Sequence, residues 1–362
     1  MSREPRITTI ITTYRRSRLL KRAVLSVLHQ SYPHLVVQIL DNASGDDTEQ
    51  VARELMGMDS RVQYHRQAEN IGGLKNLIHG IEGVTTEYFT VLSDDDLLMP
   101  GFFEAGLSAH ELDDAPVAFV ATRVVTVDES GHFADPWAHP PERLRLSPPE
   151  GMARCLKSGV SLPGVVYRTS AIRSIGVPRV AWWNWTESGW HALAAINSPI
   201  EFSPDVGAIV FLHEDSHSKK MDSLEFRLSW FEMLVDVRAM ALEGPVTRGW
   251  WTRHMMPVTS ARFLGTLVRL CTVDGSKKYE TLGRLGVASG MNALGVSGSI
   301  RLARAAQAIG LGDRLNGAIE WYLRRGNGGR KASGARSEKG DDAGIDAAAR
   351  VFLQVYFYPF LF

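Results

Sequence analysis

Three consecutive aspartates, Asp94, Asp95 and Asp96, are the residues of this sequence best suited to chemistry. They follow the mostly apolar run 88–93 and precede Pro100. Neighbouring carboxylates repel one another, and carboxylate oxygens are the ligands that hard cations such as Mg²⁺ prefer. The stretch therefore predicts a strand that delivers acidic side chains to a bound cation. The alternative is a solvated turn that binds nothing.

The elements that position these aspartates alternate regularly through the first hundred residues. Apolar and β-branched runs predict strands, and apolar positions at helical spacing predict helices. The predicted strands cover 6–14, 35–42, 62–67 and 87–93, and the predicted helices cover 17–28, 46–56 and 72–83. This order favours a parallel sheet with helices on both faces, which binds ligands beyond the carboxyl ends of its strands.

Composition excludes several classes of protein. The 362 residues are 44% hydrophobic, which supports a large core, and Lys plus Arg equals Asp plus Glu at 40 each. This balance gives no overall attraction to nucleic acid, and we expect none as a partner. Cys155 and Cys271 are too far apart for a disulfide framework or a metal motif, which favours buried thiols in a reducing cytoplasm. Because the first residues lack the pattern of a signal peptide, we expect a cytoplasmic protein.

Three longer motifs carry a resemblance to a known family. They read TTYRRSRLLKRAVLSVLHQSYPHLVVQILDNASGDDT, then NIGGLKN, then LSDDDLLMPG. In this order and spacing the chain resembles family 2 glycosyltransferases, strongly over residues 6–125 and more weakly to about residue 220. The resemblance implies the GT-A fold, an α/β Rossmann-like mixed sheet flanked by helices. It also implies inverting transfer of a sugar from a UDP- or dTDP-sugar, with Mg²⁺ or Mn²⁺ as cofactor.

The resemblance divides the chain into regions. Residues 1–220 are expected to form the glycosyltransferase domain, with a nucleotide-sugar half at 1–125 and an acceptor half at 126–220. A mainly helical C-terminal extension follows at 221–323. The Gly-, Ser- and charge-rich segment 324–344 predicts a disordered linker, and 345–362 an apolar, aromatic tail helix. This tail is too short to span a bilayer; it suits an interfacial membrane anchor, a segment that folds back on the core, or a dimer contact.

The nucleotide would be recognised at the ends of the first two strands. Tyr14 can stack on a base, and Asp41 can accept the N3 hydrogen of a uracil-like ring. The resemblance implies nucleotide-binding roles for Thr12, Tyr14 and Asp41. Each interpretation has a simpler alternative. A tyrosine at a strand end often only packs against its neighbours, and DNASGDDT is a good sequence for a turn and a helix cap.

The diphosphate would meet the loop that opens the helix at 72–83. Asn70, Gly72 and Lys75 lie where backbone N–H groups and a cation can bind phosphate. The family usually has arginine where Lys75 stands. Here an ammonium group therefore replaces a guanidinium that could donate two parallel hydrogen bonds. A solvated helix start without a ligand is the alternative.

The metal site departs from the family pattern. Ser93 stands where the family carries the first aspartate of its motif. The departure makes Asp95 the expected direct ligand, with Asp94 directed to ribose or metal and Asp96 supporting the loop within the metal site. His213 is a further candidate contact to the metal or a phosphate, on a loop expected to act as a lid; a loop histidine without a role is the alternative.

An inverting transfer also needs a base beside the acceptor hydroxyl. The string WTESGWHALAAINSPI matches the family pattern and puts Glu187 at the place of the base, with Asp205 and Glu214 as competitors. The surrounding tryptophans suit either a sugar platform or a core.

The acceptor would be a saccharide or a lipid-linked molecule, as in bacterial polysaccharide, glycolipid or glycoconjugate synthesis, and contact with the inner face of the membrane would suit such an acceptor. Two rivals remain. A nucleotidyltransferase normally has a glycine-rich first loop, which TTYRRSR lacks. A degenerate transferase acting as a binding or scaffold subunit is suggested by Ser93 and by glutamate at position 187.

Overall fold

The computed structural model of the protein describes residues 7–108, 116–134, 139–176, 186–213, 224–271 and 276–308. The predicted linker 324–344, the predicted tail 345–362 and the competing base Glu214 lie outside these residues. The chain divides into two units. One comprises Met1–Met221 with Glu243–Pro245, and the other comprises Asp222–Leu242 with Val246–Phe362.

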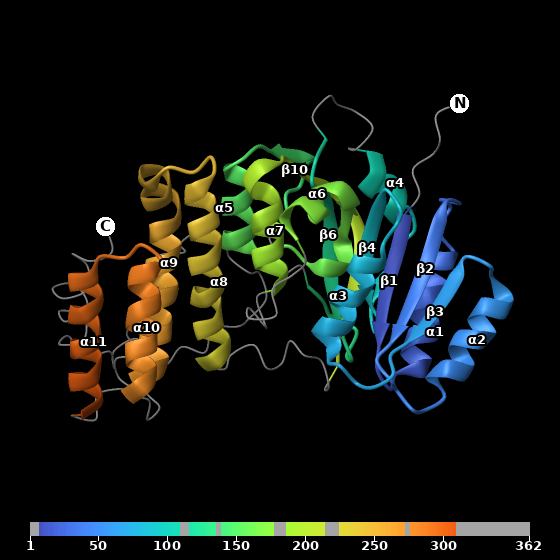
Figure 1. Cartoon of the computed structure of the whole chain (residues 1–362), viewed down its shortest axis with the longest axis horizontal. Coiled ribbons are helices and arrows are strands. Elements are labelled where there is room, and N and C mark those ends of the chain that lie inside the picture. Colours follow the sequence, from blue (N-terminus) through green and yellow to red (C-terminus); the bar gives the residue numbers. More distant parts are fainter. Residues whose placement is uncertain are drawn as a thin grey trace, which may run out of the picture. The chain divides into compact units, whose positions relative to one another are not determined.

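The first part of the chain alternates strand and helix as the sequence predicts. Its elements are β1 (Ile7–Thr13), α1 (Ser17–Leu28), β2 (Leu35–Asp41), α2 (Thr48–Met58), β3 (Val62–Arg66), α3 (Gly73–Gly83) and β4 (Tyr88–Ser93). The strands lie in the order β3-β2-β1-β4, and all of these pairs are parallel. The four strands run side by side in Figure 1.

Helices cover both faces of this parallel part. Ile11 of β1 and Ile39 of β2 belong to the same buried cluster as Leu20 of α1. On the other face Gly80 of α3 lies so close that an added Cβ would be 2.2 Å from Cδ1 of Leu40 and 3.0 Å from Cγ2 of Ile10. The apolar side chains of β1 and β2 therefore alternate between two buried layers.

The sheet becomes mixed beyond β4. The next elements are β5 (Leu97–Leu98), α4 (Phe102–Leu107), β6 (Phe119–Asp128), β7 (Phe133–Ala134), β8 (Leu144–Leu146), α5 (Glu150–Ser158), the 3-10 helix η2 (Leu162–Gly164), β9 (Val165–Arg168), α6 (Thr169–Ile175), α7 (Thr186–Asn197) and β10 (Ile200–Leu212). The sheet order continues β4-β9-β6-β10-β5. Strand β9 is antiparallel to β4 and β6, and β5 is antiparallel to β10. This confirms the mixed α/β sheet.

The second unit is helical in its described part, which confirms the helical C-terminal extension. It contains α8 (Leu224–Glu243), α9 (Arg248–Cys271), α10 (Ser276–Ala288) and α11 (Ala293–Ala308). The buried side chains of Trp230, Trp251 and Phe263 form part of its core. Among the described helices, none combines the length and apolar character that crossing a bilayer requires.

Candidate functional site

The carboxyl ends of β1, β2 and β4 meet at one edge of the sheet. Thr13 at the end of β1 pairs with Asp41 at the end of β2, and Thr12 pairs with Ser93 at the end of β4. The parallel register thus brings the predicted nucleotide residues and the aspartate run to the same edge.

Asp94 is buried and fully engaged at this edge. Its Oδ2 accepts a hydrogen bond from Thr13 Oγ1 at 2.7 Å, and its Oδ1 accepts one from Arg16 Nη1 at 3.2 Å. Burial raises the pKa of the Asp94 carboxyl, although Thr13 and Arg16 oppose the rise. These bonds fix the carboxylate beside β1.

Asp95 is partly exposed and meets two cationic or potentially cationic side chains. Its Oδ2 is 2.7 Å from Arg16 Nη1 and 3.0 Å from His213 Nε2. An ionised carboxylate only accepts hydrogen bonds, so Nε2 carries the hydrogen in this arrangement. His213 directly follows β10, which brings it to the end of β4. The expected pair of Asp95 and His213 is therefore close together.

Asp96 is hydrogen-bonded to the backbone of β10. It is 4% exposed, and its Oδ1 accepts a hydrogen bond from the backbone N–H of Phe211 in β10 at 3.2 Å. Burial raises the pKa of its carboxyl well above the usual range, and the charge of Asp95 adds to the rise. This is the arrangement of a residue that supports the loop, and it gives no support to Asp96 as a metal ligand.

The donor atoms at Asp95 fit a metal that shares its ligands with substrate. The 3.0 Å between Asp95 Oδ2 and His213 Nε2 is a hydrogen-bond distance. An ion bound by both atoms would replace the hydrogen on Nε2. Neighbouring ligands of an octahedral ion at about 2.1 Å lie roughly 3.0 Å apart, so the two atoms could bind the ion without moving far. One nitrogen and one oxygen donor suit Mn²⁺ better than Mg²⁺, which takes oxygen ligands. Within the described ranges, no group of three or more His, Cys, Asp or Glu is placed to hold a metal. Phosphates and water would have to complete the coordination.

Arg16 is the site residue that the sequence analysis missed. It belongs to the run YRRSR after β1, where the available signal was a cation at the end of a strand facing other strand ends. Burial lowers the pKa of its guanidinium, but Asp94 and Asp95 outweigh this effect and raise it. Part of the positive charge that the aspartates require thus comes from the chain itself.

Asp41 is 1% exposed and holds the loop that follows β2. Its Oδ1 accepts hydrogen bonds from Ser44 N at 2.9 Å and from Ser44 Oγ at 2.6 Å. Its Oδ2 accepts one from Tyr64 Oη at 2.7 Å. A base would have to share this carboxylate with protein donors.

Tyr14 offers an open ring beside this loop. The residue is 38% exposed, and the guanidinium carbon of Arg15 lies 5.1 Å from the ring centroid. Arg15 and Ala43 both have positive φ angles, 57° and 61°, which side chains other than glycine rarely adopt. The two loops are joined where Arg15 N donates to Ser44 Oγ at 2.9 Å.

The loop before α3 is built around Asn70. Its Oδ1 accepts hydrogen bonds from Gly72 N at 3.0 Å and from Asn42 Nδ2 at 2.8 Å. Gly72 has a φ of 86°, a conformation that glycine adopts without strain. Lys75 in the first turn of α3 is exposed. The loop links the second strand to a helix start with an accessible cation.

Glu187 lies in the first turn of α7, where its Oε2 accepts a hydrogen bond from Leu162 N at 3.2 Å. The residue is exposed to solvent, although many protein atoms surround its carboxyl group. Burial raises the pKa of this carboxyl to about 7, against the bond from Leu162. Solvent at the exposed part of Glu187 reduces this increase in the carboxyl pKa but does not reverse it. The competitor Asp205 accepts a hydrogen bond from Ser203 Oγ at 2.6 Å.

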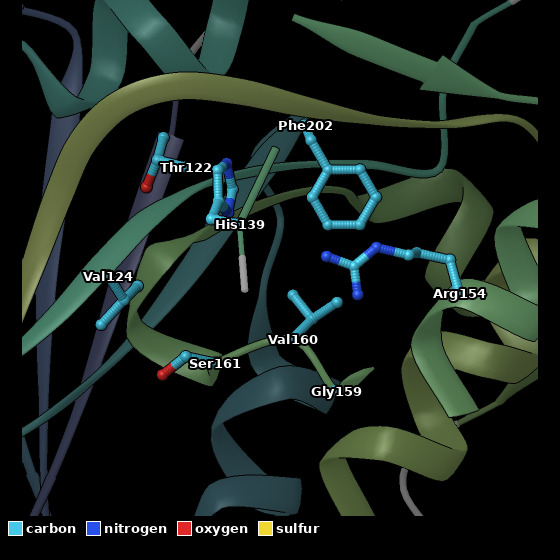
Figure 2. A pocket seen from close by; sticks show the side chains of 8 residues that line it. All are labelled: Thr122, Val124, His139, Arg154, Gly159, Val160, Ser161 and Phe202. Atoms are coloured by element: carbon cyan, nitrogen blue, oxygen red, sulfur yellow. The ribbon is translucent and has the colours of Figure 1, made fainter. Parts of the chain in front are cut away.

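A small cavity lies beside the segment that holds Glu187. Figure 2 shows Arg154 of α5 pointing into it beneath Phe202, with the guanidinium carbon 5.1 Å from the ring centroid. The remaining lining residues are Thr122, Val124, His139, Gly159, Val160 and Ser161. The space inside is about 10 Å³, close to the room that one water molecule needs. In this form the cavity cannot accept a sugar ring.

Comparison with known proteins shows which family this part of the chain resembles. The model of the family described as "Glycosyl transferase family 2" matches residues 8–173. A Campylobacter jejuni protein named GalNAc(5)-diNAcBac-PP-undecaprenol beta-1,3-glucosyltransferase is 33% identical over 102 residues, which cover 27% of this chain and 32% of that protein. Glycosyltransferase GlyG of Streptococcus pneumoniae is 29% identical over 131 residues, 35% of this chain and 42% of that protein. The matches with the first relatives thus span about a third of their length.

Solved structures resemble the fold over most of the chain. S. aureus TarS 1-349 in complex with UDP-GlcNAc superimposes with a TM-score of 0.62 at 14% sequence identity, covering 89% of this chain and 92% of that one. The complex of the same TarS fragment with UDP gives a TM-score of 0.56 at 13% identity, covering 94% and 100%. The chain has the GT-A fold, and residues 8–173 match the model of glycosyl transferase family 2.

Proposed function

We propose that this protein is a metal-dependent, inverting glycosyltransferase that moves a sugar from a UDP- or dTDP-sugar to an acceptor hydroxyl. One observation carries the proposal: Asp95 Oδ2 and His213 Nε2, 118 residues apart in sequence, lie 3.0 Å apart at the carboxyl end of β4. In a family 2 domain this is the edge of the sheet where a nucleotide would bind.

The donor would lie along the ends of β1 and β2. Tyr14 provides an open ring for a base, and Asp41 provides a carboxylate that a uracil or thymine N3–H can reach after local adjustment of Ser44 or Tyr64. Thr12 lies at the same strand ends. The fold likeness to TarS structures that contain UDP-GlcNAc or UDP supports a uridine donor.

The diphosphate would lie between the loop before α3 and Asp95. Asp95 and His213 would hold the ion, and Asp94 would hold the geometry of the edge through Thr13. Asn70, Gly72 and Lys75 would bind the phosphates through backbone N–H groups and one cation. When bound, Mn²⁺ or Mg²⁺ neutralises the charge that develops on the leaving nucleoside diphosphate.

Glu187 would act as the base. A base works best when its pKa is close to the working pH, and burial raises the pKa of this carboxyl to about 7. Leu162 N donates to Oε2, so the acceptor hydroxyl would approach Oε1. In-line attack would invert the anomeric centre as Glu187 takes the proton.

The acceptor would be a saccharide or a lipid-linked molecule in the synthesis of a bacterial polysaccharide, glycolipid or glycoconjugate. The relative from Campylobacter jejuni carries an undecaprenol-linked glycan in its name. A Bacillus subtilis relative, 26% identical over 141 residues, is named a putative teichuronic acid biosynthesis glycosyltransferase. These names support this acceptor class.

The second candidate is a catalytically degenerate subunit that binds without transferring. Two observations favour it: Ser93 replaces the first aspartate of the family motif, and Arg16 donates hydrogen bonds to both Asp94 and Asp95.

One experiment separates the two candidates. The purified chain is incubated with UDP- and dTDP-sugars and Mn²⁺, and the nucleoside diphosphate released by slow hydrolysis is measured by chromatography. An active enzyme releases UDP or dTDP from at least one donor, and Asp95→Ala abolishes the release. If the folded protein binds a donor but releases no nucleoside diphosphate in the presence of a broad acceptor panel, the protein is a subunit that binds without transferring.

A further inference from the structure

The acidic edge of the sheet already contains a cation supplied by the chain. Arg16 lies in the loop between β1 and α1, and its Nη1 reaches two carboxylates, at 3.2 Å from Asp94 Oδ1 and 2.7 Å from Asp95 Oδ2. Its side chain is 32% exposed. The guanidinium therefore bridges both aspartates from a position that remains open to solvent.

This bridge competes with a metal for one particular atom. Asp95 Oδ2 receives both Arg16 Nη1 and His213 Nε2, and it is the oxygen that an ion between Asp95 and His213 would use. Such an ion would lie about 2.1 Å from Oδ2. Two cations so close together on one oxygen repel each other, and they compete for the same lone pairs. Arg16 must release Asp95 when the ion binds.

An Arg16 side chain displaced from Asp95 keeps only Asp94 as a partner, and it gains a new one when donor is present. A guanidinium presents paired N–H donors that match two phosphate oxygens. Arg16 follows Tyr14 by two residues, so it lies beside the edge where the diphosphate would be. We infer that Arg16 is an exchangeable counter-ion that holds Asp94 and Asp95 in the free protein and moves to the donor diphosphate when the metal takes its place at Asp95.

This inference rests on the proposed function and has a consequence for binding. Without nucleotide, the metal has to displace Arg16 and leaves its charge without a new partner. With nucleoside diphosphate bound, the displaced guanidinium gains phosphate oxygens. Metal and nucleotide therefore favour each other's binding beyond their direct contact, and the effect is reciprocal.

Arg22 of α1 offers a matched control. Its Nη2 donates to the backbone oxygen of Asp95 at 3.3 Å, and its guanidinium carbon lies 4.6 Å from the ring centroid of Phe211. Arg22→Gln removes one positive charge beside Asp95 but leaves the bridge to Oδ2 intact. Arg16→Gln removes the same charge together with the bridge.

The test is a titration of Mn²⁺ followed by electron paramagnetic resonance of the free ion. Wild type, Arg16→Gln and Arg22→Gln are compared without nucleotide and with saturating UDP, after circular dichroism shows that each is folded. Without nucleotide, Arg16→Gln binds Mn²⁺ roughly tenfold tighter than wild type, and Arg22→Gln stays within about threefold. UDP strengthens Mn²⁺ binding by a smaller factor in Arg16→Gln than in wild type.

A second substitution keeps the test decisive if Arg16→Gln does not fold. Arg16→Lys keeps the charge and loses the planar fork, so Mn²⁺ alone binds about as in wild type, whereas UDP with Mn²⁺ binds several-fold more weakly. The inference is overturned if Arg16→Gln binds Mn²⁺ no more tightly than wild type, or if Arg22→Gln has the same effect. Either result leaves the proposed function intact. If the folded wild type binds neither Mn²⁺ nor UDP, the proposed function itself is wrong.

Discussion

His213 Nε2 lies 3.0 Å from Asp95 Oδ2, although the two residues are 118 positions apart. The contact forms because β10 ends beside the turn that follows β4. It joins the predicted nucleotide-binding half of the domain to the last long strand of the sheet. Substitutions at this contact and around it have distinct expected effects on metal binding, catalysis and stability.

His213→Ala is expected to weaken Mn²⁺ binding in the presence of UDP by about 10–100-fold, because it removes one of the two protein ligands proposed for the ion. His213→Asn is the matched variant, since it keeps a polar group of similar reach but a poorer metal ligand. Calorimetric titration of Mn²⁺ into the UDP-loaded protein gives the constants. Unchanged Mn²⁺ affinity in both variants would remove His213 from the metal site.

Asp96→Asn separates loop support from metal binding. Burial raises the pKa of this carboxyl, so the folded state disfavours its ionised form, and the stability of the wild type falls as pH rises from the unfolded pKa towards the folded one. Asparagine carries no charge and keeps an oxygen for Phe211 N. We expect Asp96→Asn to unfold about 2–4 °C higher than wild type at pH 7, with a smaller difference at pH 4, in thermal denaturation.

The same variant should bind Mn²⁺ and UDP within about threefold of wild type, because the proposed ligands of the ion are Asp95 and His213. A loss comparable with that of Asp95→Asn would instead make Asp96 a ligand.

Glu187→Gln is expected to lower kcat by about 10²–10⁴-fold, while UDP affinity stays unchanged. A base must be ionised, so wild-type kcat/KM should rise with pH and level off above a pKa of about 7. In Glu187→Gln this inflection should disappear. Steady-state rates measured from about pH 5.5 to about pH 9 provide the comparison. If Asp205→Asn removes the inflection and Glu187→Gln does not, the base has been assigned to the wrong residue.

Gly80→Ala tests the packing that holds β2 in place. Its Cβ would lie 2.2 Å from Cδ1 of Leu40, and both Leu40 and Ile10 are completely buried, so neither can move without cost. We expect a loss of about 1–3 kcal/mol in the free energy of unfolding, measured with urea.

Gly57→Ala is the control for Gly80→Ala, because it lies in α2 with nothing within 4 Å of the added Cβ. It should stabilise the protein by about 0.5–1 kcal/mol through helix propensity. Equal effects of the two substitutions would contradict the packing described for α3.

The fold of the first hundred residues was predictable because its signals are local. Each strand is a β-branched or apolar run, each helix has apolar positions on one face, and the parallel arrangement follows from their alternation. The second half was predictable only through the family resemblance. Strand β9 inserts between β4 and β6, and such a long-range pairing leaves no mark in the spacing of side chains.

Only part of the site was predictable, because a motif names residues but does not show their contacts in the folded chain. Asp95 and His213 could be named from the family motif, and the structure brings them together. Arg16 was missed because its role depends on where its long side chain turns. The sequence also did not predict that Asp41 and Asp96 are buried. Their partners Ser44, Tyr64 and Phe211 approach them only after the loops have folded.

Calorimetric binding of UDP, dTDP and GDP, with and without Mn²⁺, tests the central claim most directly. Wild type should bind UDP or dTDP in a Mn²⁺-dependent manner, and GDP should bind much more weakly, because the contact proposed for Asp41 uses the N3–H of a pyrimidine. Asp95→Ala should lose the Mn²⁺-dependent part. If the folded wild type binds none of the three nucleotides, the glycosyltransferase assignment of this site is contradicted.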